Sequence, residues 1–128
     1  MTKNILYIED NPDNMLLVKR VLQSRGYRLL EAKDGMEGLS MAESKEVDLI
    51  LLDINLPDVE GYEIARRLRS SGKPDLAYIP IIAITANALA GDAEKALQAG
   101  CDVYMSKPIN IRELWARVEG FLPSSGNQ

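Results

Sequence analysis

Five side chains of this sequence could act together in one reaction, because each stands at the end of a short strand-like run. They are Glu9, Asp10, Asp53, Thr85 and Lys107. Carboxylates about 4 Å apart repel by about 4 kcal/mol near a protein surface, so three of them together require a compensating cation. Mg²⁺ prefers such oxygen ligands and keeps several of its waters. With the ammonium and the hydroxyl beside it, the set could stabilise the charge of a phosphoryl group in transfer to an acidic nucleophile.

The strand before Asp53 places this residue where a ligand would bind. Residues 49–52 are apolar at every position, which is typical of a strand covered on both faces of a parallel sheet. In open sheets of this kind ligands bind beyond the carboxyl ends of the strands. Aspartate also commonly ends a strand and begins a turn, so Asp53 taken alone is open to both interpretations. Each of the other four side chains, taken singly, also has an ordinary structural interpretation. Glu9 and Asp10 could flank a helix start, Thr85 could be a β-branched strand residue, and Lys107 could be a solvated charge.

The chain alternates between strand and helix patterns, which predicts a doubly wound α/β domain with a five-stranded parallel sheet and right-handed crossovers. Asn11 before Pro12 and Asn110 three residues before Glu113 are helix-starting signals. We expect strands over residues 5–8, 27–32, 49–53, 81–85 and 103–106, five helices over 12–25, 34–44, the segment between 61 and 70, 92–99 and 110–121, and loops over 70–80 and 86–91.

Length and charge narrow the class of protein. The 128 residues, 46% of them hydrophobic, suffice for one domain with a buried core. We expect this domain over residues 1–122 and a short disordered tail over 123–128. No apolar run approaches the roughly 18 residues of a membrane span, and no signal peptide is visible, so we expect a cytoplasmic protein without membrane attachment. The net charge of -4 argues against direct nucleic-acid binding.

Two residue types exclude whole classes of chemistry. The chain contains no histidine, which excludes Ser-His-Asp and Cys-His nucleophiles, histidine general bases and histidine metal sites. Its lone cysteine, Cys101, can form no internal disulfide, and we expect a small residue packed behind Gly100. The chemistry must therefore rest on carboxylates, lysine, threonine and the backbone.

At this point the chain resembles a known family. The Glu9-Asp10 pair, the run Leu-Leu-Asp-Ile-Asn-Leu-Pro around Asp53 with Gly61 after it, Ile-Thr-Ala around Thr85 and the pair Lys107-Pro108 resemble the receiver domain of two-component response regulators. The resemblance spans residues 4–122. It implies the flavodoxin-like fold with strand order 2-1-3-4-5.

The resemblance also implies a role for each residue of the acidic set. Asp53 would accept a phosphoryl group from a phosphohistidine on a histidine kinase or a histidine phosphotransfer protein. Asp10 and Asp53 would bind Mg²⁺ together with the carbonyl of Asn55, and Glu9 would hold the ion directly or through water. Lys107 would pair with a phosphoryl oxygen. Such a domain would catalyse its own phosphorylation and dephosphorylation, with no separate substrate.

Further positions match the switch of the family. Thr85 would turn inward to bond the phosphoryl group, and Tyr104 would follow from an outward to a buried rotamer. Pro108 matches a cis peptide that aims Lys107 into the site. Glu9 departs from the family, which more often has Asp, and Asn55 and Asn87 match positions that tune the lifetime of the acyl phosphate.

The output of such a domain would be protein binding. The face formed by the fourth expected helix, the fifth strand and the fifth helix would bind a downstream protein, and Leu89 with its alanine neighbours is either core or part of such a surface. The chain would act as a monomer or as a phosphorylation-dependent dimer. The Asp-Asn-x-x-Asn start of the first helix, Asp10 to Asn14, resembles single-domain regulators of the DivK and CheY kind. It also resembles receivers excised from hybrid histidine kinases or larger regulators, and both interpretations remain open.

Three alternatives use other chemistry. A phosphohydrolase resembling the haloacid dehalogenase superfamily would use Asp53 as nucleophile, but its general acid would stand at Asn55, which cannot act as one. A Rossmann nucleotide-binding domain requires a glycine-rich turn after the first strand, where this chain has Asp10 and Pro12. A degenerate receiver would lack some of the acidic and basic groups, all of which are present here.

Overall fold

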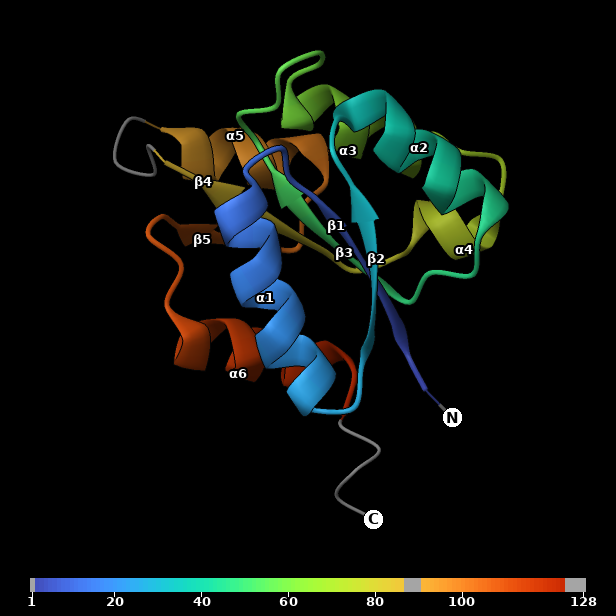
Figure 1. The fold of residues 1–128 in the computed structure, drawn as a ribbon. Helices are drawn as coiled ribbons and strands as arrows, with labels where there is room; N and C mark the ends of the chain where they lie inside the picture. The colour runs from blue at the N-terminus through green and yellow to red at the C-terminus, as the bar shows by residue number, and fades with distance from the viewer. Residues whose placement is uncertain (1, 87–90, 124–128) are drawn as a thin grey trace.

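The computed structural model describes residues 2–86 and 91–123. Within them five parallel strands form one sheet in the order β2-β1-β3-β4-β5 (Figure 1). This confirms the expected doubly wound fold and its strand order. The strands are β1 (Asn4–Ile8), β2 (Arg28–Ala32), β3 (Leu49–Asp53), β4 (Ile81–Thr85) and β5 (Val103–Ser106), and the helices are α1 (Pro12–Ser24), α2 (Gly35–Ser44), α3 (Gly61–Arg69), α4 (Pro74–Ala77), α5 (Asp92–Ala99) and α6 (Ile111–Phe121).

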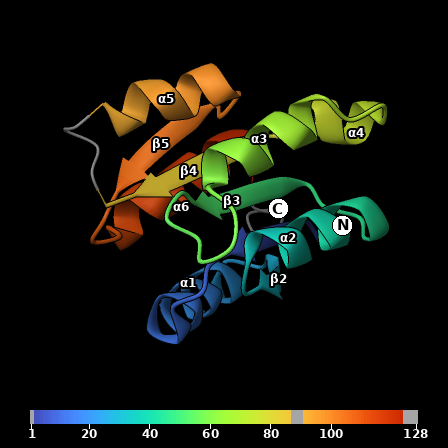
Figure 2. The ribbon, with the colours of Figure 1, turned by 90° about the horizontal axis from the view of Figure 1, so that it is seen from above.

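Helices cover both faces of the sheet. The view from above in Figure 2 shows α1 and α6 on one face and α2, α3 and α5 on the other. Neighbouring residues of one strand pack into opposite cores: Ile50 and Leu52 face the core of α2, α3 and α5, while Leu49 and Leu51 face the core of α1 and α6. Burial on both faces explains why these strands are apolar at every position.

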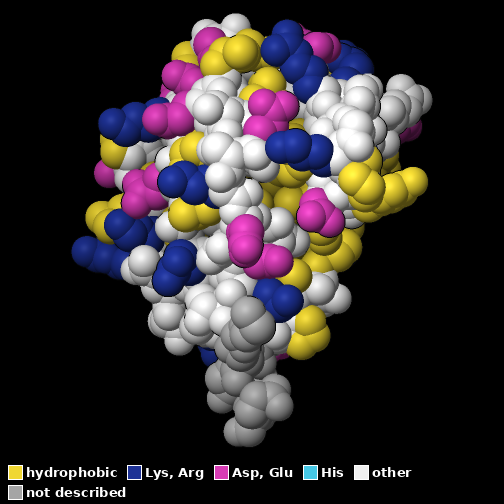
Figure 3. All heavy atoms as spheres, turned by 90° about the vertical axis from the view of Figure 1, so that its right-hand side faces the viewer, with side chains coloured by type: hydrophobic (Ala, Val, Ile, Leu, Met, Phe, Trp, Pro, Cys, Tyr) yellow, Lys and Arg dark blue, Asp and Glu magenta, His cyan; other side chains and the backbone are white. Residues whose placement is uncertain are grey.

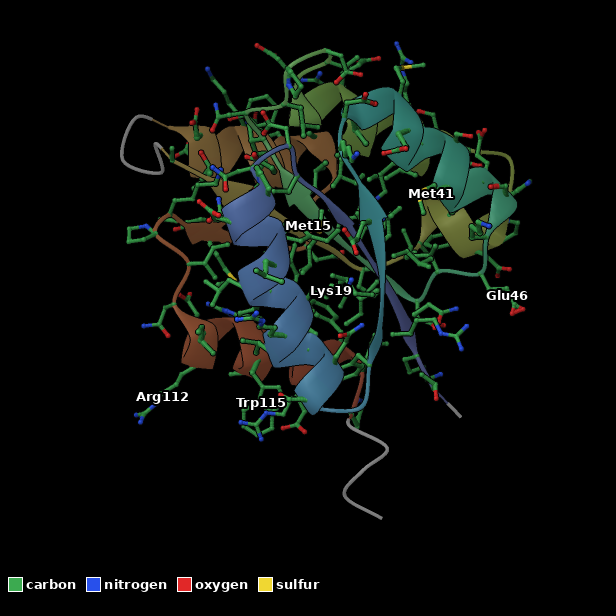
Figure 4. The ribbon with its side chains drawn as sticks, in the orientation of Figure 1. Met15, Lys19, Met41, Glu46, Arg112 and Trp115 are labelled. Atoms are coloured by element: carbon green, nitrogen blue, oxygen red, sulfur yellow. The ribbon has the colours of Figure 1, made fainter. Side chains whose placement is uncertain are left out.

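Local signals set the helix ends as the sequence predicts. The side chain of Asn11 accepts a hydrogen bond from the Asn14 amide at the start of α1, and Asn110 accepts one from the Glu113 amide at the start of α6. Each bond satisfies an amide that the first turn of a helix leaves without a partner. The middle of α6 is tied to the end of α1, because the guanidinium of Arg25, which follows α1, lies 3.8 Å from the ring centre of Trp115. Trp115 is labelled in Figure 4.

The loop expected over residues 70–80 is wrong in part, because it contains a short helix. The expected number of five helices is therefore wrong as well. Residues 74–77 form the short helix α4, so the structure has six helices among the described residues. Pro74 occupies the first turn, where its missing N–H costs nothing, and Leu76 is buried in the core. Gly72 and Pro74 favour a loop. The burial of Leu76 in the core stabilises the single helical turn. The fourth and fifth expected helices are therefore α5 and α6.

Smaller differences from the expected elements lie at the ends of helices and strands. The first helix ends at Ser24 rather than Arg25, and β2 begins at Arg28 rather than Tyr27. The expectations for Asn87 and Leu89 lie outside the described residues, as does the expected tail from residue 124 onward. Among the helices that the structure describes, none has the length and apolar character needed to cross a membrane.

Candidate functional site

The strand ends bring the predicted side chains to one edge of the sheet, the edge at which α1 begins (Figure 1). Asp53 is the last residue of β3 and Thr85 the last residue of β4. Glu9 directly follows β1, and its amide donates to Ala32 at the end of β2. Lys107 directly follows β5, and its amide donates to the carbonyl of Thr85. Parallel strands in register therefore explain why residues almost a hundred positions apart meet.

Three carboxylates form a compact acidic cluster. Glu9, Asp10 and Asp53 each offer an oxygen, and these oxygens all lie within 4.8 Å of one another. Glu9 and Asp53 are each only 1% exposed, whereas Asp10 lies at the surface. Hard oxygen donors at this spacing, one of them open to water, fit a cation of the Mg²⁺ type, which retains part of its hydration shell.

The Asp53 carboxylate is held by two donors. Lys107 places its Nζ 3.1 Å from Oδ2, and the amide of Asn55 donates to Oδ1 at 3.0 Å. The same Nζ lies 3.6 Å from Oε1 of Glu9. The peptide bond between Lys107 and Pro108 is cis, the geometry expected at this proline. One ammonium thus faces the carboxylates of Glu9 and Asp53, so the cluster keeps excess negative charge.

Glu9 has its own set of donors. The hydroxyl of Tyr7 donates to Oε1 at 2.9 Å, and the side-chain amide of Asn14 donates to the same oxygen at 3.3 Å. Burial and the neighbouring Asp53 carboxylate raise the pKa of Glu9, although Lys107 and the Tyr7 hydroxyl oppose this. A cation or a proton beside Glu9 would therefore relieve the cost of its burial next to Asp53.

Tyr7 and Asn14 are site residues that the sequence interpretation missed. Tyr7 interrupts an otherwise apolar strand two residues before Glu9, and residues two apart share a face of a strand. Its side chain is fully buried, and burial raises the pKa of its hydroxyl, so it stays a neutral donor. A buried phenol at this position was the available signal.

Thr85 and Tyr104 lie beside the cluster rather than in it. Thr85 is fully buried, and its hydroxyl donates to Oδ2 of Asp92 at 3.0 Å. Asp92 is the first residue of α5. Tyr104 is 39% exposed and points outward on β5. Asp92 also accepts through its carbonyl from the hydroxyl of Tyr62 on α3, at 3.5 Å. Thr85 is thus connected to the start of α5, a link that the sequence interpretation did not include.

Comparison with known proteins agrees with this geometry. Residues 5–119 match the family model described as the response regulator receiver domain. The chain is 38% identical to the polar-differentiation response regulator DivK of Brucella ovis, over 95% of this chain and 98% of that protein.

Solved structures show the same relationship. The receiver domain of a sensor histidine kinase from Pseudomonas aeruginosa, described with a magnesium ion coordinated in its active site cleft, is 39% identical with a TM-score of 0.86. The match covers 94% of this chain and 98% of that one. A CheY-like receiver domain protein from Methanospirillum hungatei is 30% identical with a TM-score of 0.85, over 94% of this chain and 93% of that one. The parallel sheet, the acidic cluster at its carboxyl edge and the family match agree, and the chain belongs to the receiver domains of two-component response regulators.

Proposed function

We propose that Asp53 accepts a phosphoryl group from a phosphohistidine of a histidine kinase or a histidine phosphotransfer protein. The observation that best supports this role is the position of its carboxylate, buried at a strand end between the Lys107 ammonium and the Asn55 amide. Both donors orient the carboxylate. A buried and oriented carboxylate is a competent oxygen nucleophile.

The transfer needs no other reactant than the donor. An oxygen of Asp53 attacks phosphorus, the bond between phosphorus and the donor imidazole breaks, and its electron pair returns to that ring. Asp53 leaves the step as an acyl phosphate. Lys107, 3.1 Å from the carboxylate, is placed to pair with the oxygens of the incoming group, where it offsets their developing charge.

The acidic cluster fits the Mg²⁺ that this chemistry uses. Asp10 and Asp53 would be its side-chain ligands, the carbonyl of Asn55 a further one, and Glu9 would hold it directly or through water. When bound, the ion would neutralise the repulsion between the carboxylates and the phosphoryl oxygens. The donors on Glu9 from Tyr7 and Asn14 would keep the longer glutamate side chain at the side of this site.

The response would pass through Thr85 to α5. Turning its hydroxyl toward the phosphoryl group would break the bond to Asp92 and release the first turn of α5. Tyr104 would then move from its outward rotamer inward, changing the face of α5, β5 and α6 that binds a downstream protein, with the chain as a monomer or as a phosphorylation-dependent dimer. Population of a second state by phosphorylation suffices for this.

The described face that bears α2 and α4 shows no continuous basic patch of the kind that binds nucleic acid. Figure 3 shows that acidic and basic side chains interleave there among the described residues. We place the receiver domain over residues 1–122 and its output in protein binding.

The test is phosphorylation by acetyl phosphate. The purified chain is incubated with acetyl phosphate with and without Mg²⁺, and intact mass is followed for the wild type, Asp53→Asn and Asp102→Asn. The third variant is a matched control, because it changes an aspartate at the opposite end of the sheet. We expect one phosphoryl group on the wild type and on Asp102→Asn, only with the metal, and none on Asp53→Asn. Equal labelling of Asp53→Asn would refute the role of Asp53.

A further inference from the structure

A carboxylate outside the acidic cluster connects two distant segments. Asp58 lies in the loop between β3 and α3, yet both of its oxygens accept from the first turn of α2. Its Oδ1 accepts from the Gly35 amide at 2.8 Å, and its Oδ2 accepts from the Met36 amide at 3.0 Å. These amides belong to the group that a helix leaves without internal partners. The hydrogen bond from Gly35, and then that from Met36, lower the pKa of Asp58, so the carboxylate form is favoured.

The two segments also approach closely at Gly35. A Cβ on this glycine would lie 2.9 Å from Cδ1 of Ile64 and 3.3 Å from Oδ1 of Asp58. A side chain at this position would force the Ile64 side chain and the Asp58 carboxylate to shift. The contact between the loop and α2 is therefore built into the packing as well as into the hydrogen bonds.

The loop that carries Asp58 is closed at its base. The amide of Gly61 donates to the carbonyl of Ile54 at 3.0 Å. A Cβ on Gly61 would lie 2.7 Å from Cα of Ile54 and 2.8 Å from the carbonyl oxygen of Asp53, so the two ends of the loop are in contact. Between these ends, Leu56 and Val59 pack against the core. Asp58 adds the hydrogen bonds that fasten the loop to α2.

The first residue of this loop after its base touches the phosphoryl acceptor. The amide of Asn55 donates to Oδ1 of Asp53 at 3.0 Å, and Asn55 lies three residues before Asp58. A shift of the loop therefore moves a donor of the reacting carboxylate. This gives a continuous path from the α2 amides through Asp58 and Asn55 to Asp53.

We propose that Asp58 is a positioning residue for phosphoryl transfer: by fastening the loop to the first turn of α2, it holds the Asn55 amide against the Asp53 carboxylate. The role of Asp58 rests on the proposed function of Asp53 and adds to it. It makes α2, which contributes no side chain to the acidic cluster, part of the support of the site.

The experiment compares two carboxylate caps of the same helix. Asp58→Ala removes the cap that comes from the loop. Asp34→Ala removes the cap from the helix's own start, where Asp34 accepts from the Glu37 amide at 2.8 Å and makes no hydrogen bond to the loop that the structure records. We expect both variants to weaken α2, and only the first to loosen the loop. The rate of labelling by acetyl phosphate with Mg²⁺ and the hydrogen exchange of the Asn55 and Gly61 amides are measured for each.

We expect Asp58→Ala to slow labelling about tenfold, since small misplacements of a reacting group have effects of that order, and Asp34→Ala to label within about twofold of wild type. Amide exchange at Asn55 should accelerate in Asp58→Ala alone. Asp58→Asn keeps one acceptor oxygen and should recover part of the rate. Equal slowing in both alanine variants, or a wild-type rate in Asp58→Ala, would overturn the proposal.

Failure of the proposed function is recognisable separately. If the wild type takes up no phosphoryl group, the role of Asp53 fails, and with it the catalytic part of the inference. The exchange measurement needs no phosphorylation. Unchanged exchange at Asn55 in Asp58→Ala would overturn the positioning role whatever the labelling shows.

Discussion

The two ends of the sheet use charged side chains in opposite ways. At the amino ends of the strands, Arg69 donates to the carbonyls of Gly100, Ala77 and Ile79 and to the carboxylate of Asp102, at distances of 2.6 to 3.1 Å. This one guanidinium joins α3 to the residues around α4 and to the connection between α5 and β5. Each of these four hydrogen bonds ends on a backbone carbonyl or a carboxylate of the protein itself.

At the carboxyl ends the charges do not balance. Glu9 and Asp53 share one ammonium, that of Lys107, and Asp10 adds a third carboxylate nearby. A charge whose partners are all parts of the fold serves stability, whereas a buried surplus of one sign is available for a ligand. Sites of this kind are kept at a cost in stability.

The largest expected effect is at the amino end. Arg69→Ala should lower the free energy of unfolding by about 2–4 kcal/mol, because several hydrogen bonds to a charged and mostly buried group are lost together. Arg66→Ala on the same helix is the control, since the exposed Arg66 pairs with Glu63 at 3.6 Å and such pairs contribute less than about 1 kcal/mol. Denaturant unfolding measures both. A loss below that of Arg66→Ala would contradict the structural role of Arg69.

The next effect is at the carboxyl end and requires the metal. Mg²⁺ at 100 times its dissociation constant should raise the free energy of unfolding of the wild type by about 2.7 kcal/mol. Asp10→Asn and Asp53→Asn should lose most of this increment, whereas Arg69→Ala should retain it. Unfolding with and without Mg²⁺ decides the matter. Loss of the increment in Arg69→Ala would show that the two ends are not independent.

A smaller effect has the opposite sign. Without Mg²⁺, Asp53→Asn should stabilise the protein by up to about 1 kcal/mol, because it removes repulsion from the buried Glu9 while Lys107 keeps one carboxylate partner. Asp102→Asn should destabilise it, because Asp102 accepts from both Arg69 and the Ile81 amide. Thermal or denaturant unfolding in a chelating buffer compares them. Destabilisation of equal size in both variants would remove the distinction between the two ends.

The smallest effect concerns the pH dependence of the loop contact. Because the pKa of Asp58 is lowered by its bonds to the α2 amides, its contribution to stability is complete above the ordinary aspartate pKa of about 3.9 and is lost as the pH falls through the lowered value. The stability advantage of wild type over Asp58→Asn should therefore be constant near neutral pH and shrink in strong acid. An advantage that grows on acidification would contradict this sign.

Several features of the fold were predictable because their causes are local. Runs of apolar residues indicate the strands, and Asn11 and Asn110 mark helix starts through bonds that span three residues. The buried Cys101 is also as expected, and burial raises the pKa of its thiol to about 11. The helix α4 was missed because its single turn depends on a distant pocket for Leu76 rather than on its own sequence.

The residues of the site also fall into those that local sequence predicts and those that depend on distant contacts. Polar residues at strand ends can be found from the pattern alone, because parallel strands of one sheet present their carboxyl ends at one edge. Tyr7, Asn14, Asp58 and Arg69 were missed, since their importance lies in which partner each one reaches.

The alternation of strands and helices and the family can be predicted from the amino-acid pattern alone. The same pattern predicts the sheet edge at which five side chains gather: Glu9, Asp10, Asp53, Thr85 and Lys107. The long-range pairings become visible only in the folded molecule: Lys107 with Asp53 across 54 residues, Asp58 with the start of α2 across 23, and Arg69 with Asp102 across 33. Propensities and caps act over a few residues, whereas these bonds form only after the packed sheet and helices have brought distant segments within about 3 Å.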